Sequence, residues 1–362
     1  MNGDSAGAVK RITEDDFSSD SYRELLGQLF GRESVDRKLK YTRWLCAQNP
    51  FLPPGADLPV YVYWVEGRPV GQICVIPLEL VVEGTVLKAG WLVDGHIIPE
   101  WQRRGVGSEV HRAMVKDFRP LLALGVNEKS VRHLTKLGWK SSSSLTRYKR
   151  LSLKPGIIHR AILLKAGLNK AAKVKKPRFP ETQESLGIRC DRIASIQDVG
   201  AIPECQVPNA TAVKSYISRT SEFIRWRYLM NPFVQYGIYR LRTAAGAEAY
   251  AIWRLETNGA WTKAVLVHLL YATGFSKADM TDTGRALLRI AGATGAEMFE
   301  CQTTDSDLLR ALPGGPLKRI EPGTRFMYSF GAGDNTHLSS EELRLYAGDC
   351  DVDAVTTWRS SP

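Results

Sequence analysis

Two glycines and two arginines lie directly before a predicted helix, in the sequence Gln-Arg-Arg-Gly-Val-Gly-Ser at positions 102–108. An apolar stretch of strand length, residues 90–93, precedes them. Pro99 ends that strand, because proline has no amide hydrogen for a ladder hydrogen bond. After the glycines, apolar residues recur every three or four positions, which is the period of an amphipathic helix. They are Val110, Met114, Val115 and Phe118.

This strand, loop and helix are suited to binding an anion. The first amide groups of a helix have no intrahelical acceptor, and the helix dipole adds roughly half a positive charge there. Gly105 and Gly107 let phosphate oxygens approach the main chain, because neither has a Cβ atom. The loop has neither the Gly-Lys-Ser/Thr of a nucleoside triphosphate site nor the third glycine of the dinucleotide fingerprint. We therefore predict a phosphate site of another kind.

The loop resembles the pyrophosphate loop of the GNAT superfamily of acetyl-CoA-dependent N-acyltransferases, whose signature after a strand is Gln/Arg-x-x-Gly-x-Gly/Ala. The resemblance implies direct transfer of an acetyl or other acyl group from CoA to an amine acceptor. It also implies that main-chain groups of the preceding strand bind the pantetheine arm, here His96, Ile97 and Ile98. The loop would bind the pyrophosphate, through Gln102, Arg103, Arg104, Gly105, Val106, Gly107 and Ser108. Arg103 and Arg104 either add charge toward the phosphates or are ordinary solvated arginines.

Direct transfer needs a base for the amine. Asp94 and His96 are candidates, because side chains two apart on the strand that leads into the loop point the same way. The alternative for Asp94 is that it caps the turn at Gly95.

An acid for the leaving thiolate is less clear. In the family this acid is often a tyrosine in the pattern Asn-x-x-Ala-x-x-Leu-Tyr-x-x-x-Gly-Phe. The matching stretch here, residues 127–139, has Leu134 at that position. His133 and Tyr148 are the substitutes, with a surface or packing role as the alternative for His133.

An internal repeat divides the chain into two halves. Residues 41–51 recur as 223–233 with Arg, Trp, Asn, Pro and Phe identical, and residues 146–148 are echoed by 324–326. Tryptophans and Asn-Pro-Phe turns are typical of packing and helix ends rather than catalysis. We predict two copies of one α/β (α+β) fold, each a mixed, mainly antiparallel sheet flanked by helices. In the first copy, Glu66-Gly67 and Glu83-Gly84 indicate hairpins.

The second half lacks the glycine signature, and Asp279 would repel a pyrophosphate near the next predicted helix. Tandem GNAT proteins with one working and one degenerate domain are known, and the chain resembles them. The predicted organisation is a GNAT-like acyl-CoA-binding catalytic domain at 1–150, a basic helical linker at 151–189 and a degenerate GNAT-like domain at 190–362.

The net charge of +11 is concentrated in residues 151–180, which contain eight lysines or arginines and no acid. A nucleic-acid binder more often spreads its charge along a whole face with interleaved aromatics, so no nucleic acid is expected. Residues 156–176 have an apolar stripe opposite lysines. They form either an interdomain helix, which we favour, or a helix that contacts an anionic membrane or an acidic partner.

The cysteine pattern and the hydropathy of the chain argue against several classes of protein. Six scattered cysteines without a Cys-x-x-Cys motif indicate reduced thiols in a cytoplasmic protein and no metal site. No apolar run is long enough to span a membrane, and the polar start lacks a signal-peptide core. Near the C-terminus Asp349, Asp351 and Asp353 alternate, which is typical of a loop, with a site for a cationic substrate as the alternative.

Two functions follow from these features. The first is an N-acyltransferase with acetyl-CoA or another acyl-CoA as co-substrate, and the second is a non-catalytic CoA-binding or scaffold protein, which the absent tyrosine favours. The acceptor is left open among a small amine, an amino sugar and a protein lysine, as is the oligomeric state.

Overall fold

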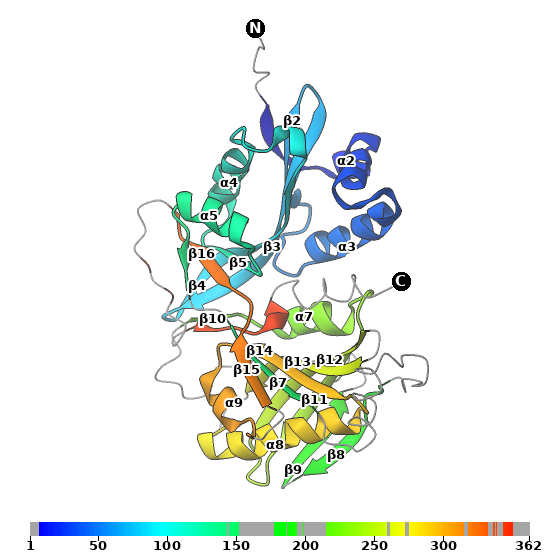
Figure 1. The fold of residues 1–362 in the computed structure, drawn as a ribbon, viewed down its shortest axis with the longest axis vertical. Coiled ribbons are helices and arrows are strands. Elements are labelled where there is room, and N and C mark those ends of the chain that lie inside the picture. The colour runs from blue at the N-terminus through cyan, green and yellow to red at the C-terminus, as the bar shows by residue number, and fades with distance from the viewer. Residues whose placement is uncertain are drawn as a thin grey trace, which may run out of the picture. The chain divides into compact units, whose positions relative to one another are not determined.

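The chain folds into two compact units, each built on one sheet (Figure 1). The computed structural model describes residues 7–142, 145–151, 177–185, 187–193, 198, 215–258, 261–271, 275–314, 318–331, 336, 338 and 343–349. The first unit comprises Met1–Ser142 and Arg325–Leu338, and the second Ser143–Thr324 and Ser339–Pro362. The predicted mixed α/β class is confirmed, because each unit has helices against a sheet with both parallel and antiparallel pairs.

The sheet of the first unit has β4 and β5 as its parallel pair. In sheet order its strands are β1 (Ala8–Ile12), β2 (Leu58–Val65), β3 (Arg68–Val82), β4 (Thr85–Ile97), β5 (Leu121–Leu124), β16 (Phe326–Ser329) and β6 (Lys140–Ser141). The helices are α1 (Glu14–Ser18), α2 (Asp20–Phe30), α3 (Val35–Ala47), α4 (Val106–Asp117) and α5 (Glu128–Lys136), with 3-10 turns η1 (Arg32–Ser34) and η2 (Pro99–Trp101). Helices α2 and α3 cover one face of the sheet, and α4 and α5 lie on the other (Figure 1).

The sheet of the second unit has β13 and β14 as its parallel pair. In sheet order its strands are β8 (Thr182–Ser185), β9 (Ile188–Ile193), β11 (Tyr236–Arg242), β12 (Glu248–Asn258), β13 (Trp261–Tyr271), β14 (Met298–Thr303), β7 (Thr146–Leu151) and β15 (Lys318–Pro322). Outside both strand orders, β10 (Ser215–Ile217) pairs in parallel with β17 (Leu343–Arg344). The helices are α7 (Ser221–Ile224), the π-helical η5 (Arg225–Leu229), α8 (Lys277–Ala293), α9 (Ser306–Ala311) and the 3-10 turn η6 (Ala347–Asp349).

The two sheets exchange one strand each. Strand β7, expected to complete the first half, pairs with β14 and β15 in the second unit. Strand β16, from the second half, pairs with β5 and β6 in the first. The compact units are therefore built from non-contiguous segments rather than from one contiguous range each. Residues 152–176, which contain most of the expected basic linker, lie outside the described part of the chain.

The repeated Asn-Pro-Phe turns have the structural role that their residue types indicate. Asn49 Oδ1 accepts a hydrogen bond from the amide of Phe51 at 2.8 Å, and Asn231 Oδ1 accepts the equivalent one from Phe233 at 2.9 Å. Each asparagine thus closes the turn that follows its helix. The tryptophan of the repeat is buried in both copies.

Both expected hairpins form in the first unit. The strand β3 is 15 residues long and belongs to both, pairing with β2 on one side and β4 on the other. Glu66-Gly67 and Glu83-Gly84 form the two-residue turns, and all four residues have positive φ. This is the backbone of a type I′ turn, which suits the twist of antiparallel strands.

Candidate functional site

The candidate site begins where β4 separates from β5. The two strands pair only at Gly90 and Trp91, opposite Leu121 and Leu122. Beyond Trp91, the edge of β4 that faces β5 has no strand partner among the described strands. Backbone groups along this edge are therefore available to hydrogen-bond a ligand.

The end of β4 contains a β-bulge. Val93 pairs opposite Cys74 and His96 opposite Gln72, so one extra residue on β4 is unmatched. Asp94, in the bulge, has φ +53°, a left-handed backbone that non-glycine residues seldom adopt. Because a bulge re-aims the side chains beside it, the simple alternation expected along this strand does not apply here.

The loop after β4 ends at an uncapped helix. Gly105 precedes α4 with φ +83°, and no side chain caps the helix. In this fully described loop, no acceptor bonds the backbone amides of residues 103–107. A Cβ on Gly105 would contact nothing within 4 Å, so glycine is required here by its conformation and not by crowding. The amides and the helix dipole together provide an anion-binding terminus.

The side chains of the loop have different tasks. Gln102 Nε2 donates to the carbonyl oxygen of Ile97 at 3.0 Å, and Lys129 Nζ donates to Gln102 Oε1 at 3.3 Å. Gln102 therefore braces the loop against β4 and α5. Arg103 and Arg104 are exposed, with the Arg104 guanidinium 5.0 Å from the centroid of the Trp101 ring.

Asp94 is not a free carboxylate. Its Oδ2 forms an ion pair with Nζ of Lys38 on α3, and the two side chains are only 12% and 4% exposed. The sequence analysis missed Lys38. The sequence contains one indication of its role. Lys38 lies on the apolar side of α3, and a lysine buried there requires a partner for its charge.

His96 lies close to this pair but is exposed. Its ring meets Phe30 of α2 edge to face, with centroids 4.9 Å apart. Partial desolvation lowers the pKa of His96, Asp94 raises it and Lys38 lowers it, for a net downward shift. His96 is therefore mostly neutral near pH 7, with a lone pair available to accept a proton.

His133 lies on the loop side of the sheet. Its Nε2 is 3.0 Å from where a Cβ on Gly107 would be. The neighbouring His111 is buried and accepts a hydrogen bond at Nε2 from Trp139 Nε1 at 2.7 Å. Burial, with a smaller contribution from His133, lowers the pKa of His111 to about 4.

The expectation for Tyr148 is wrong. It lies on β7 within the core of the second unit, and its hydroxyl donates to the carbonyl oxygen of Pro313 at 2.8 Å. Its strand was assigned to the first half from its position in the sequence, but β7 pairs with β14 and β15 in the sheet of the second unit.

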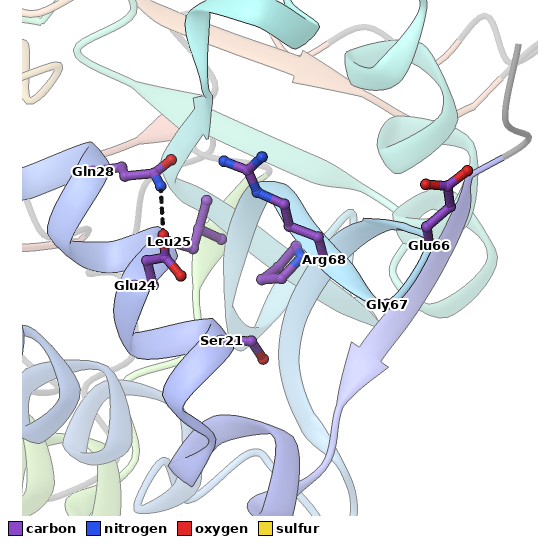
Figure 2. Close-up of a pocket in the computed structure, with 8 residues that line it drawn as sticks. Ser21, Glu24, Leu25, Gln28, Glu66, Gly67 and Arg68 are labelled. Atoms are coloured by element: carbon purple, nitrogen blue, oxygen red, sulfur yellow. Dashed lines mark hydrogen bonds between the residues drawn. The ribbon is translucent and has the colours of Figure 1, made fainter.

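The site residues thus divide between two faces of one sheet. His133 and α4 are on one face, whereas Asp94 and His96 contact α3 and α2 on the other. The unpaired edge of β4 connects these faces. A hollow of about 160 Å³ between α2 and the β2–β3 hairpin contains none of the predicted site residues (Figure 2).

Comparison with known proteins gives a fold but no close relative. No family model and no curated protein sequence matches the chain. Among solved structures, a GCN5-related N-acetyltransferase from Kribbella flavida is 13% identical with a TM-score of 0.56, covering 90% of this chain and 72% of its own. One from Anabaena variabilis is 11% identical with a TM-score of 0.56, covering 90% and 73%. A probable N-acyltransferase from Enterococcus faecalis is 12% identical with a TM-score of 0.56, covering 89% and 72%. The chain has the GNAT fold.

The second sheet differs from the first at the place where the GNAT fold has its loop. The first turn of α8 is capped from within. Ser276 Oγ accepts from the amide of Asp279 at 3.3 Å, and Asp279 Oδ2 accepts from the amide of Ser276 at 2.8 Å. This capping box occupies the N-cap amide of α8, whose counterpart in α4, at Gly105, is open, and it adds a carboxylate.

A segment near the C-terminus lies along the ends of β13 and β14. Thr303 of β14 bridges to Tyr346, and the amide of Thr304 donates to the carbonyl oxygen of Leu345 at 3.0 Å. On the β13 side, the ring of His268 lies 5.3 Å from that of Tyr346, and its Nε2 is 3.5 Å from Asp349 Oδ1. This segment therefore covers the ends of β13 and β14, whereas the edge of β4 beyond Trp91 is open in the first sheet.

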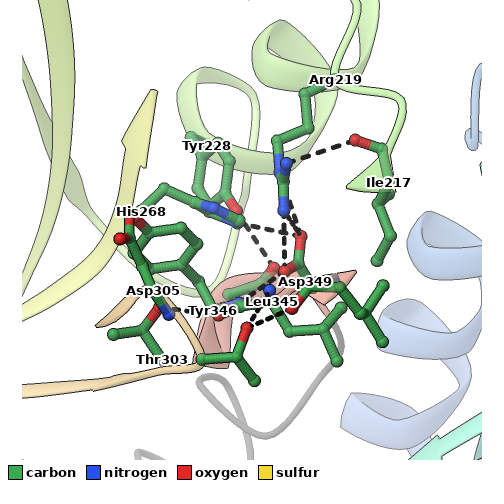
Figure 3. A network of polar contacts seen from close by, with 12 residues as sticks. Ile217, Arg219, Tyr228, His268, Thr303, Asp305, Leu345, Tyr346 and Asp349 are labelled. Atoms are coloured by element: carbon green, nitrogen blue, oxygen red, sulfur yellow. Dashed lines mark hydrogen bonds and ion pairs between the residues drawn. The ribbon is translucent and has the colours of Figure 1, made fainter. Parts of the chain in front are cut away.

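Buried polar contacts fix this segment (Figure 3). Arg219 donates from Nη2 to both oxygens of Asp349, at 2.6 and 2.8 Å, and both side chains are buried. The hydroxyl of Tyr346 donates to Asp305 at 2.8 Å. Asp349 is therefore a structural partner and not a receptor for a cationic substrate, whereas Asp351 and Asp353 lie outside the described residues.

Two further features concern the described residues only. They contain no group of three or more His, Cys, Asp or Glu side chains arranged to hold a metal ion. None of their helices is long and apolar enough to cross a membrane.

Proposed function

We propose that the chain is an N-acyltransferase that moves an acetyl or other acyl group from CoA to an amine, with its CoA site in the first unit. Two neighbouring features support this most. The five backbone amides of residues 103–107 have no acceptor, and the edge of β4 that leads to them has no strand partner among the described strands. The amides suit a diphosphate, and a strand edge suits the amide groups of a pantetheine arm.

Acyl-CoA supplies an activated thioester. Loop residues 103–107 would hold its diphosphate, and main-chain groups at His96, Ile97 and Ile98 would orient its arm. The amine nitrogen bonds to the acyl carbon as the carbon–sulfur bond breaks. The base, Asp94 or His96, takes the proton that the nitrogen loses, and the thiolate gains one, for which His133 is the candidate donor.

In the same proposal, the second unit is a degenerate copy that binds no CoA. The capping box of Ser276 and Asp279 and the covered ends of β13 and β14 support this. The cytoplasmic location and the amine acceptor belong to the proposal too.

A non-catalytic CoA-binding protein is the second candidate. One observation favours it: Leu134, half-buried on α5, stands where the family often has its tyrosine.

Titration of CoA into the full chain by calorimetry, followed by thiol release from acetyl-CoA with a panel of amines, tests both candidates. Binding with release supports the enzyme, and binding without release supports the second candidate. The absence of binding contradicts both.

A further inference from the structure

A lysine that no sequence motif marks lies at the bulge of β4. Lys38 is 3% exposed and projects from α3 toward Asp94. Its Nζ is also 4.8 Å from the centroid of the Phe30 ring and 5.3 Å from that of Tyr41. An isolated buried charge is strongly disfavoured. The carboxylate of Asp94 and the two aromatic faces stabilise the buried ammonium of Lys38.

This ion pair decides between the two candidate bases. For Asp94 to accept a proton, its buried ion pair with Lys38 would be broken, which is costly. His96 has no such constraint. Its ring is exposed on one side and touches Phe30 on the other, the same ring that Lys38 contacts.

We propose that Lys38 is a positioning residue whose ion pair with Asp94 fixes the β4 bulge, so that His96 is the base that deprotonates the amine. This inference rests on the proposed function. In the step, the amine proton passes to an imidazole nitrogen of His96 while the nitrogen–carbon bond forms and the carbon–sulfur bond breaks. His96 then releases the proton to water.

The charges around His96 come from several elements. Asp94 is on its own strand and Lys38 is on α3, with opposite effects on its pKa. On β3, the residue opposite His96 is the neutral Gln72. The buried Tyr22 of α2 donates to Gln72 Oε1 at 2.7 Å, and its pKa is raised well above the usual value, mainly by burial, so it stays neutral. Cys46 of α3 also stays neutral, because burial raises its pKa to about 12.

The test is a titration of His96 by NMR in the full chain, with Lys38→Met, Asp94→Asn and the double variant, and with His96→Gln to assign its signal. Lys38→Met removes a repelling cation and unpairs Asp94, so the pKa of His96 rises. Asp94→Asn lowers it, and the double variant returns it toward the wild-type value. Lys38→Arg, which keeps the ion pair, leaves it nearly unchanged and serves as the fold control.

Activity supplies the second readout. The acid limb of kcat/KM against pH is expected to move with the His96 titration in each variant, and His96→Gln is expected to lower kcat/KM about 100-fold or more. Unmoved titrations in both single variants, or full activity in His96→Gln, overturn the inference. Failure of the proposed function is a different result, namely no CoA binding by the unaltered chain.

Discussion

The ring of His133 lies against Gly107, with Nε2 only 3.0 Å from the position that a Cβ on this glycine would occupy. The contact joins α5 to the first turn of α4. A Cβ at position 107 would press on the His133 ring, whereas the φ of Gly107 itself is not in the left-handed region. The two glycines of the loop thus have different roles. Gly105 adopts a positive φ, whereas Gly107 leaves room for the His133 ring.

Replacing Gly107 with valine should weaken CoA binding. The added methyl groups would push against His133 and cover amides that are open in the wild-type chain. Loss of one or two charge-assisted hydrogen bonds, each worth about 1.5–3 kcal/mol, predicts a fall in affinity of at least about tenfold. Calorimetry with CoA measures it. Gly107→Ala, which needs only a small shift of the His133 side chain, is the milder comparison, and equal affinity in all three chains would contradict the prediction.

Gly105 offers a prediction with a matched control. Gly105→Ala and Gly84→Ala each place a side chain at φ near +83°, and neither new Cβ would contact anything within 4 Å. Both should therefore lose about 1–2 kcal/mol of unfolding free energy from the strained backbone. Only Gly105→Ala should also weaken CoA binding, because the directions of the open amides at residues 103–107 depend on the backbone conformation of residue 105. Urea unfolding and calorimetry separate the two effects, and an equal loss of CoA affinity in both variants would exclude a role specific to the loop.

The loop was predictable because its information is local. Strand, glycines and helix follow each other within some thirty residues, and the structure has a helix beginning at Val106 as the apolar period indicates. The repeat was also visible in the sequence, and Asn49 and Asn231 make the same Oδ1 hydrogen bond, to the amide two residues further on, in both halves. The mixed α/β class followed from these patterns.

Features that join distant segments were not predictable. Lys38 and Asp94 are 56 positions apart, and nothing in the spacing of charges pairs them. The exchange of β7 and β16 is equally hidden, because each strand pairs with a sheet from the other half of the sequence. Tyr148 was misplaced for this reason.

His111 predicts a pH dependence of stability. Its pKa is about 4 in the folded chain, against about 6.5 when unfolded. Between these values the unfolded state binds more protons, so the free energy of unfolding falls as pH decreases from about 6.5 to 4. The full loss is about 3 kcal/mol. His111→Gln keeps an acceptor for Trp139 and should remove part of this slope in urea unfolding. His268, buried with a lowered pKa, retains its own contribution.

The exposed His133 is the control for that experiment. His133→Gln should leave most of the slope in place, because His111 stays buried and keeps its lowered pKa in this variant. A slope that is the same in His111→Gln and the unaltered chain would show that His111 does not contribute.

Arg219 predicts how firmly the segment over β13 and β14 is held. Arg219→Met leaves the buried carboxylate of Asp349 without its bidentate partner, although Arg227 still lowers the pKa of that carboxyl slightly. Removing one member of a buried ion pair costs about 3–5 kcal/mol. Arg285→Met is the matched control, because its pair with Asp282 is exposed and worth at most about 1 kcal/mol. Urea unfolding measures both, and Asp349→Asn combined with Arg219→Met should recover part of the loss, since no charge then remains buried alone. If Arg219→Met and Arg285→Met were equally stable, the segment would be held by its apolar contacts and not by the ion pair of Arg219 with Asp349.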